Sequence, residues 1–434
     1  SSWANALPDL HLALEGNGNV QIWVAEGVYY ADPKINDPNI SFTVRPFVQL
    51  YGGFQGNETT LEQRDPDLYT TTLTGNGNTF HVVKTRNDAS IDGFTITGGN
   101  AVDTSDGHAN GGGILIEGST QIQNCIITGN YATNNGGGIY NDSYTVSITD
   151  CVFSNNEAGY QGGAIYTFDG EADIFNSTFI NNGAKGGGAL FTDSHSGIGD
   201  LTFVNRCSFT KNYISIEGGD PNDDGGAAIK IYRGTDAVIT NSLFTGNFGN
   251  THGGGGGVIS AFGAGGGGDF VKIYNCTVAY NTNLHESPAV NSRQGQVALK
   301  NSIVWKNSGY FGASFEQQVN EELLQYCEYS IIGNFPVEYF PSGTTITNAD
   351  PMFRSPRGAD GIFNTGDENF NLLPYSPAID HARDTLLIDA PPADQGDLDG
   401  NNRFELDPYT YDGVSDLDIG CYEYTPQSTS TNGF

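Results

Sequence analysis

The sequence predicts an all-β protein, a right-handed parallel β-helix closed at its N-terminal end by a short helix. Three observations support this prediction. A seven-residue segment recurs along much of the chain, every copy closes on an asparagine, and glycine pairs or runs open the units in which the copies lie. Apolar and polar residues alternate within each unit, and this period of two is typical of half-buried strands.

The recurring segment reads NCIITGN at 124–130 and DCVFSNN at 150–156, and it returns at intervals of 26 to 35 residues. A unit of this length holds three short strands and three turns, but no helix. Strands this short cannot bury a face alone, so the units must stack into a solenoid with rungs about 4.8 Å apart. The closing residues of the seven copies are Asn130, Asn156, Asn182, Asn212, Asn247, Asn281 and Asn307.

The repeated asparagines and cysteines have a structural interpretation. Asparagines at one turn position can form a ladder in which each side chain hydrogen-bonds the backbone of the next rung, which satisfies buried turn amides. Cys125, Cys151, Cys207 and Cys276 share one position with serines in other units. We therefore expect small, buried, stacked side chains there. A disulfide between Cys125 and Cys151 is the less favoured alternative.

The ends of the chain depart from the repeat. Residues 2–14 place leucines and Trp3 on one helical face, as expected of a helix that caps the open end of a solenoid. We predict a cap with the first strand over 1–30, β-helix rungs over 31–310, and a less regular segment over 311–424 that closes the helix. Residues 425–434 are predicted to be a linker.

The charge of the chain restricts its partners. Lys and Arg total 18 against 50 Asp and Glu, giving a net charge of −32. Such a surface repels nucleic acid and anionic membranes, and no apolar run is long enough to span a bilayer. We expect no nucleic-acid partner, no membrane insertion and a monomer. Carboxylates suit Ca²⁺, which is the one cofactor predicted, although solubility in a salty medium also explains the charge.

At both ends the chain resembles a known family. The N-terminal QIWVAEGVYY, LYGGFQGNETTLEQRD and DGFTITGGNA resemble secreted right-handed parallel β-helix proteins of Bacteroidota-type bacteria. The C-terminal DLDGNNRFELD and DIGCYEY resemble the choice-of-anchor segment that closes many of them. The resemblance implies an exported protein, surface-attached or released. It does not imply one activity, because such proteins include polysaccharide lyases, hydrolases and adhesins.

One row of outward side chains is the predicted substrate-binding strip. If Ile139, Ile165 and Leu190 point inward, then Tyr140, Tyr166 and Phe191 point outward at consecutive rungs, because strand side chains alternate. Sugar rings stack on flat aromatic strips of this kind. The alternative is that the rings pack beneath flanking loops. The binding residues predicted with this row are Tyr140, Tyr166, Phe191, His195 and Tyr232.

The predicted catalytic residues follow the strip. Lys230 with Arg233 could remove the proton beside a uronate carboxylate, aided by a cation such as Ca²⁺, in a lyase. Asp169 with Asp193 could instead serve an inverting hydrolase, which needs two carboxylates about 6.5–9.5 Å apart. Neither pattern is specific, since charged residues are ordinary on a solenoid surface.

Two segments are candidates for binding Ca²⁺. The run DPNDDGG supplies Asp220, Asp223 and Asp224, and QGDLDGN supplies Asp397 and Asp399 before Gly400. The second resembles half of a calcium loop, but Gln395 replaces its first Asp and Leu406 stands where the bidentate Glu belongs. Turn formation by Asp and Asn is the alternative.

Together these patterns predict a secreted or cell-surface protein that engages an extracellular polysaccharide along the outward strip. Cleavage of the polysaccharide by a lyase or a hydrolase activity is a further hypothesis. The alternative function is a non-enzymatic adhesin or surface-display protein whose solenoid carries loops.

Overall fold

The structure is a computed structural model of the 434-residue chain. It describes residues 3–16, 18–34, 37–104, 107–195, 200–214, 225–249, 257–263, 270–283, 289–293, 296–309, 318–319, 326–333, 345–363, 365–383, 396–401, 403 and 417–424.

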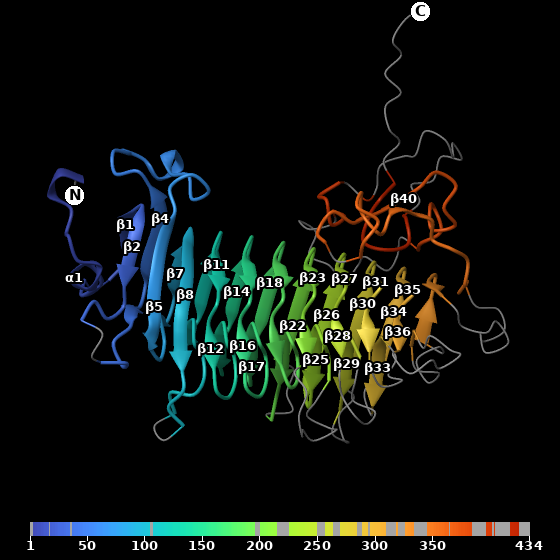
Figure 1. The fold of residues 1–434 in the computed structure, drawn as a ribbon, viewed down its shortest axis with the longest axis horizontal. Coiled ribbons are helices and arrows are strands. Elements are labelled where there is room, and N and C mark those ends of the chain that lie inside the picture. Colours follow the sequence, from blue (N-terminus) through green and yellow to red (C-terminus); the bar gives the residue numbers. More distant parts are fainter. Residues whose placement is uncertain are drawn as a thin grey trace, which may run out of the picture.

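The chain is a right-handed parallel β-helix, as predicted, and each rung contributes one strand to each of several parallel sheets (Figure 1). The first, sheet A, contains β1 (Val20–Ala25), β4 (Val48–Phe54), β7 (Ala89–Asp92), β10 (Thr120–Gln123), β14 (Val146–Thr149), β18 (Ala172–Phe175), β22 (Asp200–Asn205), β26 (Thr235–Thr240), β30 (Phe270–Tyr274), β34 (Gln296–Lys300) and β37 (Cys327–Glu328).

Sheet B follows sheet A within each rung. Its strands are β2 (Gly27–Tyr30), β5 (Thr71–Thr79), β8 (Phe94–Ala101), β11 (Ile126–Thr128), β15 (Val152–Ser154), β19 (Thr178–Ile180), β23 (Ser208–Thr210), β27 (Leu243–Thr245), β31 (Thr277–Ala279), β35 (Ile303–Trp305) and β38 (Ile331–Ile332). After it comes a narrow sheet D, made of β12 (Tyr131–Ala132), β16 (Glu157–Ala158), β20 (Gly183–Ala184), β24 (Tyr213–Ile214), β28 (Phe248–Gly249), β32 (Thr282–Asn283) and β36 (Ser308–Gly309).

Sheet C completes each rung and carries the predicted strip. Its strands are β3 (Phe42–Val44), β6 (Val83–Thr85), β9 (Ile114–Ile116), β13 (Ile139–Asp142), β17 (Ile165–Phe168), β21 (Leu190–Asp193), β25 (Ile229–Tyr232), β29 (Ile259–Phe262) and β33 (Val290–Arg293).

Inward side chains of sheets A, B and C form one continuous core along the solenoid axis. Phe153, Phe179, Phe209 and Phe244 stack in a column, with neighbouring ring centroids 4.6–4.9 Å apart and ring planes within 5° of parallel. The register explains this, because each phenylalanine occupies the same position of sheet B in successive rungs. The two central rings, Phe179 and Phe209, therefore bury both faces against phenylalanine. At the ends of the column, Phe153 is followed by Ile127 and Phe244 by Val278.

The predicted asparagine ladder is confirmed. Asn156 donates its backbone N–H to Asn182 Oδ1 at 3.1 Å and its side-chain amide to the same oxygen at 3.0 Å. Asn182 repeats both bonds toward Asn212. The side-chain amide of Asn182 also donates to the carbonyl of Phe153, 2.9 Å away. Each asparagine thus satisfies backbone groups that no strand pairing reaches.

The cysteine position is also buried, as expected. Cys125 and Cys151 stand at this position in adjacent rungs and are thiols rather than a disulfide. The backbone N–H of Cys151 donates to Ser177 Oγ of the next rung at 3.1 Å. Serine and cysteine alternate here because both are small enough to stack.

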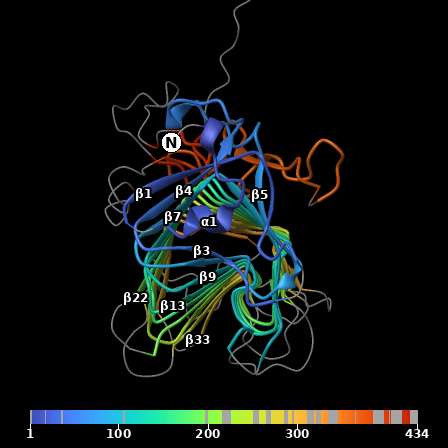
Figure 2. The same ribbon diagram turned by 90° about the vertical axis from the view of Figure 1, so that its left-hand side faces the viewer.

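The N-terminal cap is shorter than predicted. The helix α1 covers only Leu10–Leu14, and Trp3–Asn5 form one turn of 3-10 helix. Pro8 separates the two, because a proline disfavours helical backbone at the residue before it. Asp9 then caps α1 by accepting the N–H of His11. Figure 2 shows α1 lying over the open end of the coil, where Leu10 and Leu14 join the core.

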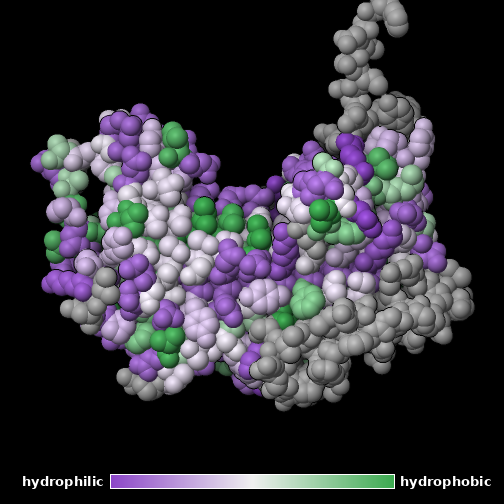
Figure 3. All heavy atoms as spheres, viewed as in Figure 1, coloured by the Kyte–Doolittle hydropathy of each residue, from purple (hydrophilic) through white to green (hydrophobic). Residues whose placement is uncertain are grey.

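Ile346 still joins the solenoid core and Thr347 pairs with Ile331. The described parts of the chain from residue 350 onward form a layer outside the solenoid, here called the C-terminal layer. It contains the antiparallel pair β39 (Phe353–Ser355) and β40 (Asn369–Leu372). Phe353, Phe370 and Ile419 pack on Ile303 and Trp305, which point outward from sheet B. In Figure 3 this layer rises above the solenoid, and a notch separates it from the N-terminal elements.

Candidate functional site

The predicted strip lies on the outer face of sheet C in the expected register. Tyr140, Tyr166, Phe191 and Lys230 face one another across β13, β17, β21 and β25. The preceding residue of each strand, from Ile139 onward, points into the core and has at most 1% of its surface exposed. Alternation of side chains along short, stacked strands produces this arrangement.

The strip belongs to a larger aromatic cluster formed by Tyr140, Tyr166, Phe168, Phe191, Tyr232 and Phe262. The rings of Tyr140 and Tyr166 stack 5.4 Å apart and within 3° of parallel, and Tyr166 stacks on Phe191 at 5.6 Å. Such offset ring pairs stabilise each other beyond the burial of their area.

Burial divides the aromatic cluster. Phe191 has no exposed surface, and Tyr166 and Tyr232 are 5% and 8% exposed. Tyr140, Phe168 and Phe262 are half-buried at its margin. A sugar ring can reach only these marginal rings in this conformation, so the centre of the cluster has the character of a small external core. The predicted binding roles of Tyr166, Phe191 and Tyr232 stay predictions.

Glycines hold the neighbouring turns against this cluster. The backbone of Gly187 has a φ of +59°, and a Cβ built on it would lie 2.8 Å from the Cβ of Phe191. Any larger residue would therefore be strained in its backbone and would push Phe191 off the sheet. The glycine pair in GGALFTD thus has a packing reason that the repeat alone did not reveal.

Lys230 is enclosed by the cluster. Its side chain has no exposed surface, and Nζ donates to Ser260 Oγ on the next strand at 3.2 Å. The amine also lies 5.6 Å from the ring centre of Phe262 and 5.9 Å from that of Tyr232. Cation–π contacts of this kind stabilise a buried ammonium. The predicted role of Lys230 as a catalytic base, which is untested, would require substrate to reach this enclosed amine.

Arg233 and Asp193 form an ion pair beside the cluster. The guanidinium donates to both carboxylate oxygens, at 2.8 Å from Nη2 and 3.3 Å from Nε, and lies 4.5 Å above the ring of Tyr232. Burial raises the pKa of Asp193 above its ordinary value, while the bonded Arg233 opposes that rise. The pair fixes the end of β21 against the turn after β25.

Asp169 and His195 meet at the same edge of sheet C. Asp169 Oδ1 accepts the backbone N–H of His195 at 2.6 Å and the hydroxyl of Ser194 at 3.1 Å. The exposed imidazole of His195 lies edge-on to Phe168, 5.0 Å between centroids. The structure therefore brings all the predicted binding and catalytic residues of the strip onto one face, with their charged groups engaged by protein partners. Their catalytic roles stay predictions.

The open part of the same face includes two cations, Lys84 and Arg86, that the sequence did not single out. On strands β6 and β9, Lys84 and Leu115 precede Tyr140 in the same column, and all three are half-buried. Arg86 and Glu117 follow two residues after Lys84 and Leu115 and form an ion pair of 3.1 Å. The signal was present in FHVVKTRN, whose VKT aligns with the ILI of the next glycine-rich unit.

Electrostatics distinguish this open part. Burial lowers the pKa of Lys84, Glu117 partly offsets the change, and Arg86 adds to it. Burial, followed by the nearby Asp142, raises the pKa of Tyr140 to about 12, so its hydroxyl stays protonated and can donate. The hydroxyl donates to Asp142 Oδ2 over a long 3.5 Å. The open part can thus offer a sugar a ring face, a hydroxyl donor and cations.

The predicted metal ligands divide into two groups. Asp220, Asp223 and Asp224 lie outside the described residues. Asp397 is fully buried, and its oxygens accept N–H groups from the backbone and side chain of Asn401 and from the backbone of Glu423, at 2.6–3.0 Å. Asp399 accepts a long bond of 3.4 Å from Asn371. Donor N–H groups around Asp397 suit a turn rather than a cation, so this segment does not fit a calcium loop.

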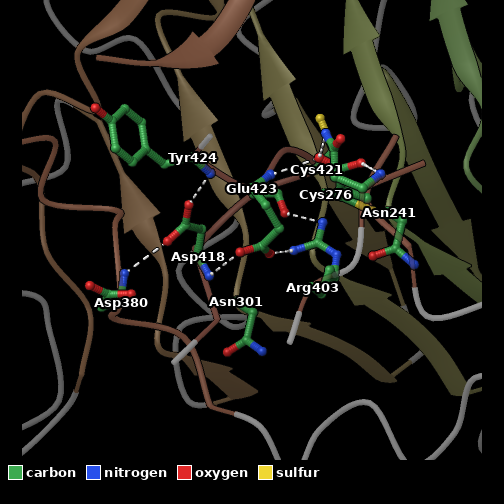
Figure 4. Close-up of polar contacts among 12 residues, drawn as sticks. Asn241, Cys276, Asn301, Asp380, Arg403, Asp418, Cys421, Glu423 and Tyr424 are labelled. Atoms are coloured by element: carbon green, nitrogen blue, oxygen red, sulfur yellow. Dashed lines mark hydrogen bonds and ion pairs between the residues drawn. The ribbon is translucent and has the colours of Figure 1, made fainter. Parts of the chain in front are cut away.

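Asp397 accepts the backbone N–H of Glu423. Glu423, Arg403 and Asp418 belong to a buried polar network that anchors the C-terminal layer (Figure 4). Arg403 has no exposed surface, pairs with Glu423 and donates to the carbonyl of Gly420 at 2.8 Å. Gly420 in turn donates its N–H to the carbonyl of Asn301, on the ridge of the solenoid, at 2.8 Å. The network therefore ties the DLDGNNR and DIGCYEY segments to the rungs, which is a structural role.

The described residues contain no group of three or more His, Cys, Asp or Glu side chains placed to hold a metal ion. Within the same ranges, no helix is long and apolar enough to cross a membrane.

Comparison with known proteins gives distant likenesses. The family model described as the Chlamydia polymorphic membrane protein repeat matches residues 124–142 and 150–167. No curated protein matches the chain. Among solved structures, pectate lyase Pel9A is similar at 13% identity and a TM-score of 0.43, covering 93% of this chain and 88% of that one. The pectin methylesterase from Aspergillus niger is similar at 11% identity and a TM-score of 0.31, covering 78% and 92%.

The family model covers two rungs, and the solved structures are too remote to carry an activity across. The chain is a parallel β-helix repeat protein, and its function has to be argued from its own surface.

Proposed function

We propose that this protein binds an extracellular polysaccharide along the open part of the outer face of sheet C. The observation that supports the proposal is that the aromatic stack, buried at Tyr166 and Phe191, becomes partly exposed at Tyr140. There a ring backed by Tyr166 is half-buried and continues a column with Leu115. A rigid, partly exposed ring beside hydrogen-bonding groups is the usual platform for a sugar.

The support of Tyr140 matters for this role. Its ring is held by stacking on Tyr166 and by close packing of Gly111, where an added Cβ would lie 3.0 Å from the Cβ of Tyr140. A preorganised ring loses little conformational freedom when a sugar stacks on it. Marginal rings farther along the face, Phe168 and Phe262, could extend the contact.

Binding can be tested by titrating soluble neutral and acidic polysaccharides into the protein and into Tyr140→Ala. We expect the substitution to weaken binding about 5- to 150-fold, if the sugar gains the ~1–3 kcal/mol that a base gains by stacking on an aromatic side chain. Tyr30→Ala is a matched control, because Tyr30 is a 46% exposed tyrosine on sheet B. If the wild type and Tyr140→Ala bound the polysaccharide with equal affinity, the proposal would be contradicted.

Cleavage is a separate question, and the same samples answer it. A lyase would generate the ultraviolet absorbance of an unsaturated sugar, and a hydrolase would release reducing ends without it. Variants of Lys230, Arg233, Asp169 and Asp193 then test the predicted catalytic residues, with circular dichroism to verify that each is folded.

A non-enzymatic role as an adhesin or surface-display protein is the second candidate. It is favoured by Lys230, Arg233 and Asp193, whose charges are engaged within the protein. Binding without new absorbance or reducing ends would support it. In either case we propose an exported protein of the Bacteroidota β-helix type, at the cell surface or released. Detection of the tagged protein in washed-cell and medium fractions of a producing cell would test that location.

A further inference from the structure

Positive charge is scarce in the N-terminal part of the chain. Residues 1–184 contain only five Lys or Arg residues: Lys34, Arg45, Arg64, Lys84 and Arg86. Arg64 is committed to Asp92 through an ion pair of 2.6 Å in which both side chains are largely buried. Of the remaining four, Lys84 lies on β6, and Arg45 and Arg86 directly follow β3 and β6.

These three cations form a compact block on the outer face of sheet C. Thr43 of β3 pairs with Lys84 of β6, so the two share the column that continues to Leu115 and Tyr140. The backbone N–H of Arg86 donates to the carbonyl of Val44 at 3.0 Å. This bond continues the register of β3 and β6 to the residues that follow them. Arg45 and Arg86 therefore share the second outward column, one rung or about 4.8 Å apart.

The three side chains are held differently. Arg45 Nη1 donates to the carbonyl of Glu15 at 2.7 Å, and Arg86 pairs with Glu117 at 3.1 Å. Among the described residues, Lys84 makes no hydrogen bond or ion pair within bonding distance. It lies half-buried between its neighbours. Burial disfavours its charged form, as the lowered pKa of Lys84 records. An anion brought beside the amine would stabilise that form.

We propose that Arg45, Lys84 and Arg86 recognise the carboxylates of an acidic polysaccharide whose neighbouring rings lie on Leu115 and Tyr140. This inference rests on the proposed function and names its substrate class as a polymer of uronic acids. Lys84 is the central contact, because it lies in the same column as Leu115 and Tyr140. The planar guanidinium groups beside it can bind a carboxylate through paired N–H donors.

The negative net charge of the protein favours a narrow anionic ligand over a broad anionic surface. A net charge of −32 repels broad anionic surfaces such as a membrane or a nucleic acid duplex. A single polysaccharide strand can follow the block while it keeps away from the acidic remainder. Because the contacts are between charges at a surface, we expect affinity to fall steeply as salt is added.

The experiment measures the affinity of polygalacturonate, a sulfated galactan and a neutral glucan for the full chain and for the double variant Lys84→Gln/Arg86→Gln. We expect the wild type to prefer polygalacturonate, and the double variant to bind it at least about tenfold more weakly. Its affinity for the neutral glucan is expected to be unchanged. Lys211→Gln is the matched control for the loss of one charge, because Lys211 lies in a turn next to sheet B.

The outcomes separate this inference from the proposed function. Equal affinity of the wild type and the double variant for polygalacturonate would overturn the inference, and the same is true if Lys211→Gln weakens it as much. Stronger binding of the sulfated polymer would overturn the assignment of uronic acids. Loss of both charged and neutral binding in Tyr140→Ala, with loss of charged binding alone in the double variant, would support both. A wild type that binds no polymer would overturn both.

Discussion

The asparagine ladder makes a quantitative prediction about stability. Asn182 has no exposed surface and lies at the middle of the ladder. Its Oδ1 accepts the backbone N–H of Asn156 at 3.1 Å, and its amide donates to the carbonyl of Phe153 at 2.9 Å. Asn182→Ala removes both contacts and leaves the N–H of Asn156 buried without that acceptor.

The magnitude follows from these contacts. The buried N–H of Asn156, left unsatisfied, costs about 1–3 kcal/mol, and the lost bond to the carbonyl of Phe153 adds about 1 kcal/mol. We therefore expect Asn182→Ala to lower the free energy of unfolding by about 2–4 kcal/mol. Asn182→Asp should be at least as damaging, because a carboxylate would face the carbonyl of Phe153 and Asn212 Oδ1 with no donor.

The assay is urea unfolding followed by circular dichroism, with the slope of each transition compared between variants. The slope matters because a solenoid can unfold in sections, which would lower it. Asn181→Gly is the control: Asn181 is exposed and its φ of +55° suits glycine. Within the described residues its side chain bonds only Asn155, and its backbone bond to Thr210 would be kept in the variant. If Asn182→Ala loses no more stability than Asn181→Gly, the ladder does not stabilise the rungs as argued.

Three further predictions follow from the structure. Phe191→Ala should lower the free energy of unfolding by about 3–5 kcal/mol, because it leaves a cavity where a buried ring lay. Tyr140→Ala should lower it by less than half as much. Equal losses in urea unfolding would contradict the division of the aromatic cluster into a buried centre and an open margin. Burial raises the pKa of Asp418 to about 6 from an ordinary value of 3.8. The charged form is therefore penalised in the folded state, so the contribution of Asp418 to stability should be greatest below pH 4 and fall by up to about 3 kcal/mol as pH rises to about 6. Asp418→Asn should flatten that profile, and an equally steep fall in the variant would assign it to other groups. Finally, if the run with Asp220 binds Ca²⁺, a chelator should lower the melting temperature, Asp220→Asn should abolish that effect, and Asp397→Asn should not; calcium sensitivity that survives Asp220→Asn would disprove this site.

The sequence predicted the rungs well because their determinants are local and repeated. Asn156 and Asn182 occupy equivalent places in successive units, and stacked short strands leave one arrangement in which both can be buried and bonded. The outward direction of Tyr140, Tyr166 and Phe191 followed from the same alternation. The helix over 2–14 was predicted too long, because the leucine pattern outweighed the break at Pro8.

The exposure of the candidate site could not be predicted in the same way. Alternation fixes which way Phe191 and Lys230 point, but it does not reveal what packs on them, and both are fully buried. Lys84 and Arg86 were overlooked because they precede the recognisable glycine-rich frame. Only the pairing of β6 with β9 places them in line with Tyr140.

The sequence by itself determined the architecture, since a repeated pattern of small, apolar and asparagine residues has few ways to bury its strands other than stacking. Tertiary structure decided how the surface is divided. It buries the middle of the aromatic row and leaves the margin of that row open beside three cations. It also places the DLDGNNR segment in a buried network around Arg403, which anchors the C-terminal layer. The physical reason is range: strand direction depends on the nearest residues, whereas exposure and charge pairing depend on segments that meet only in the folded chain.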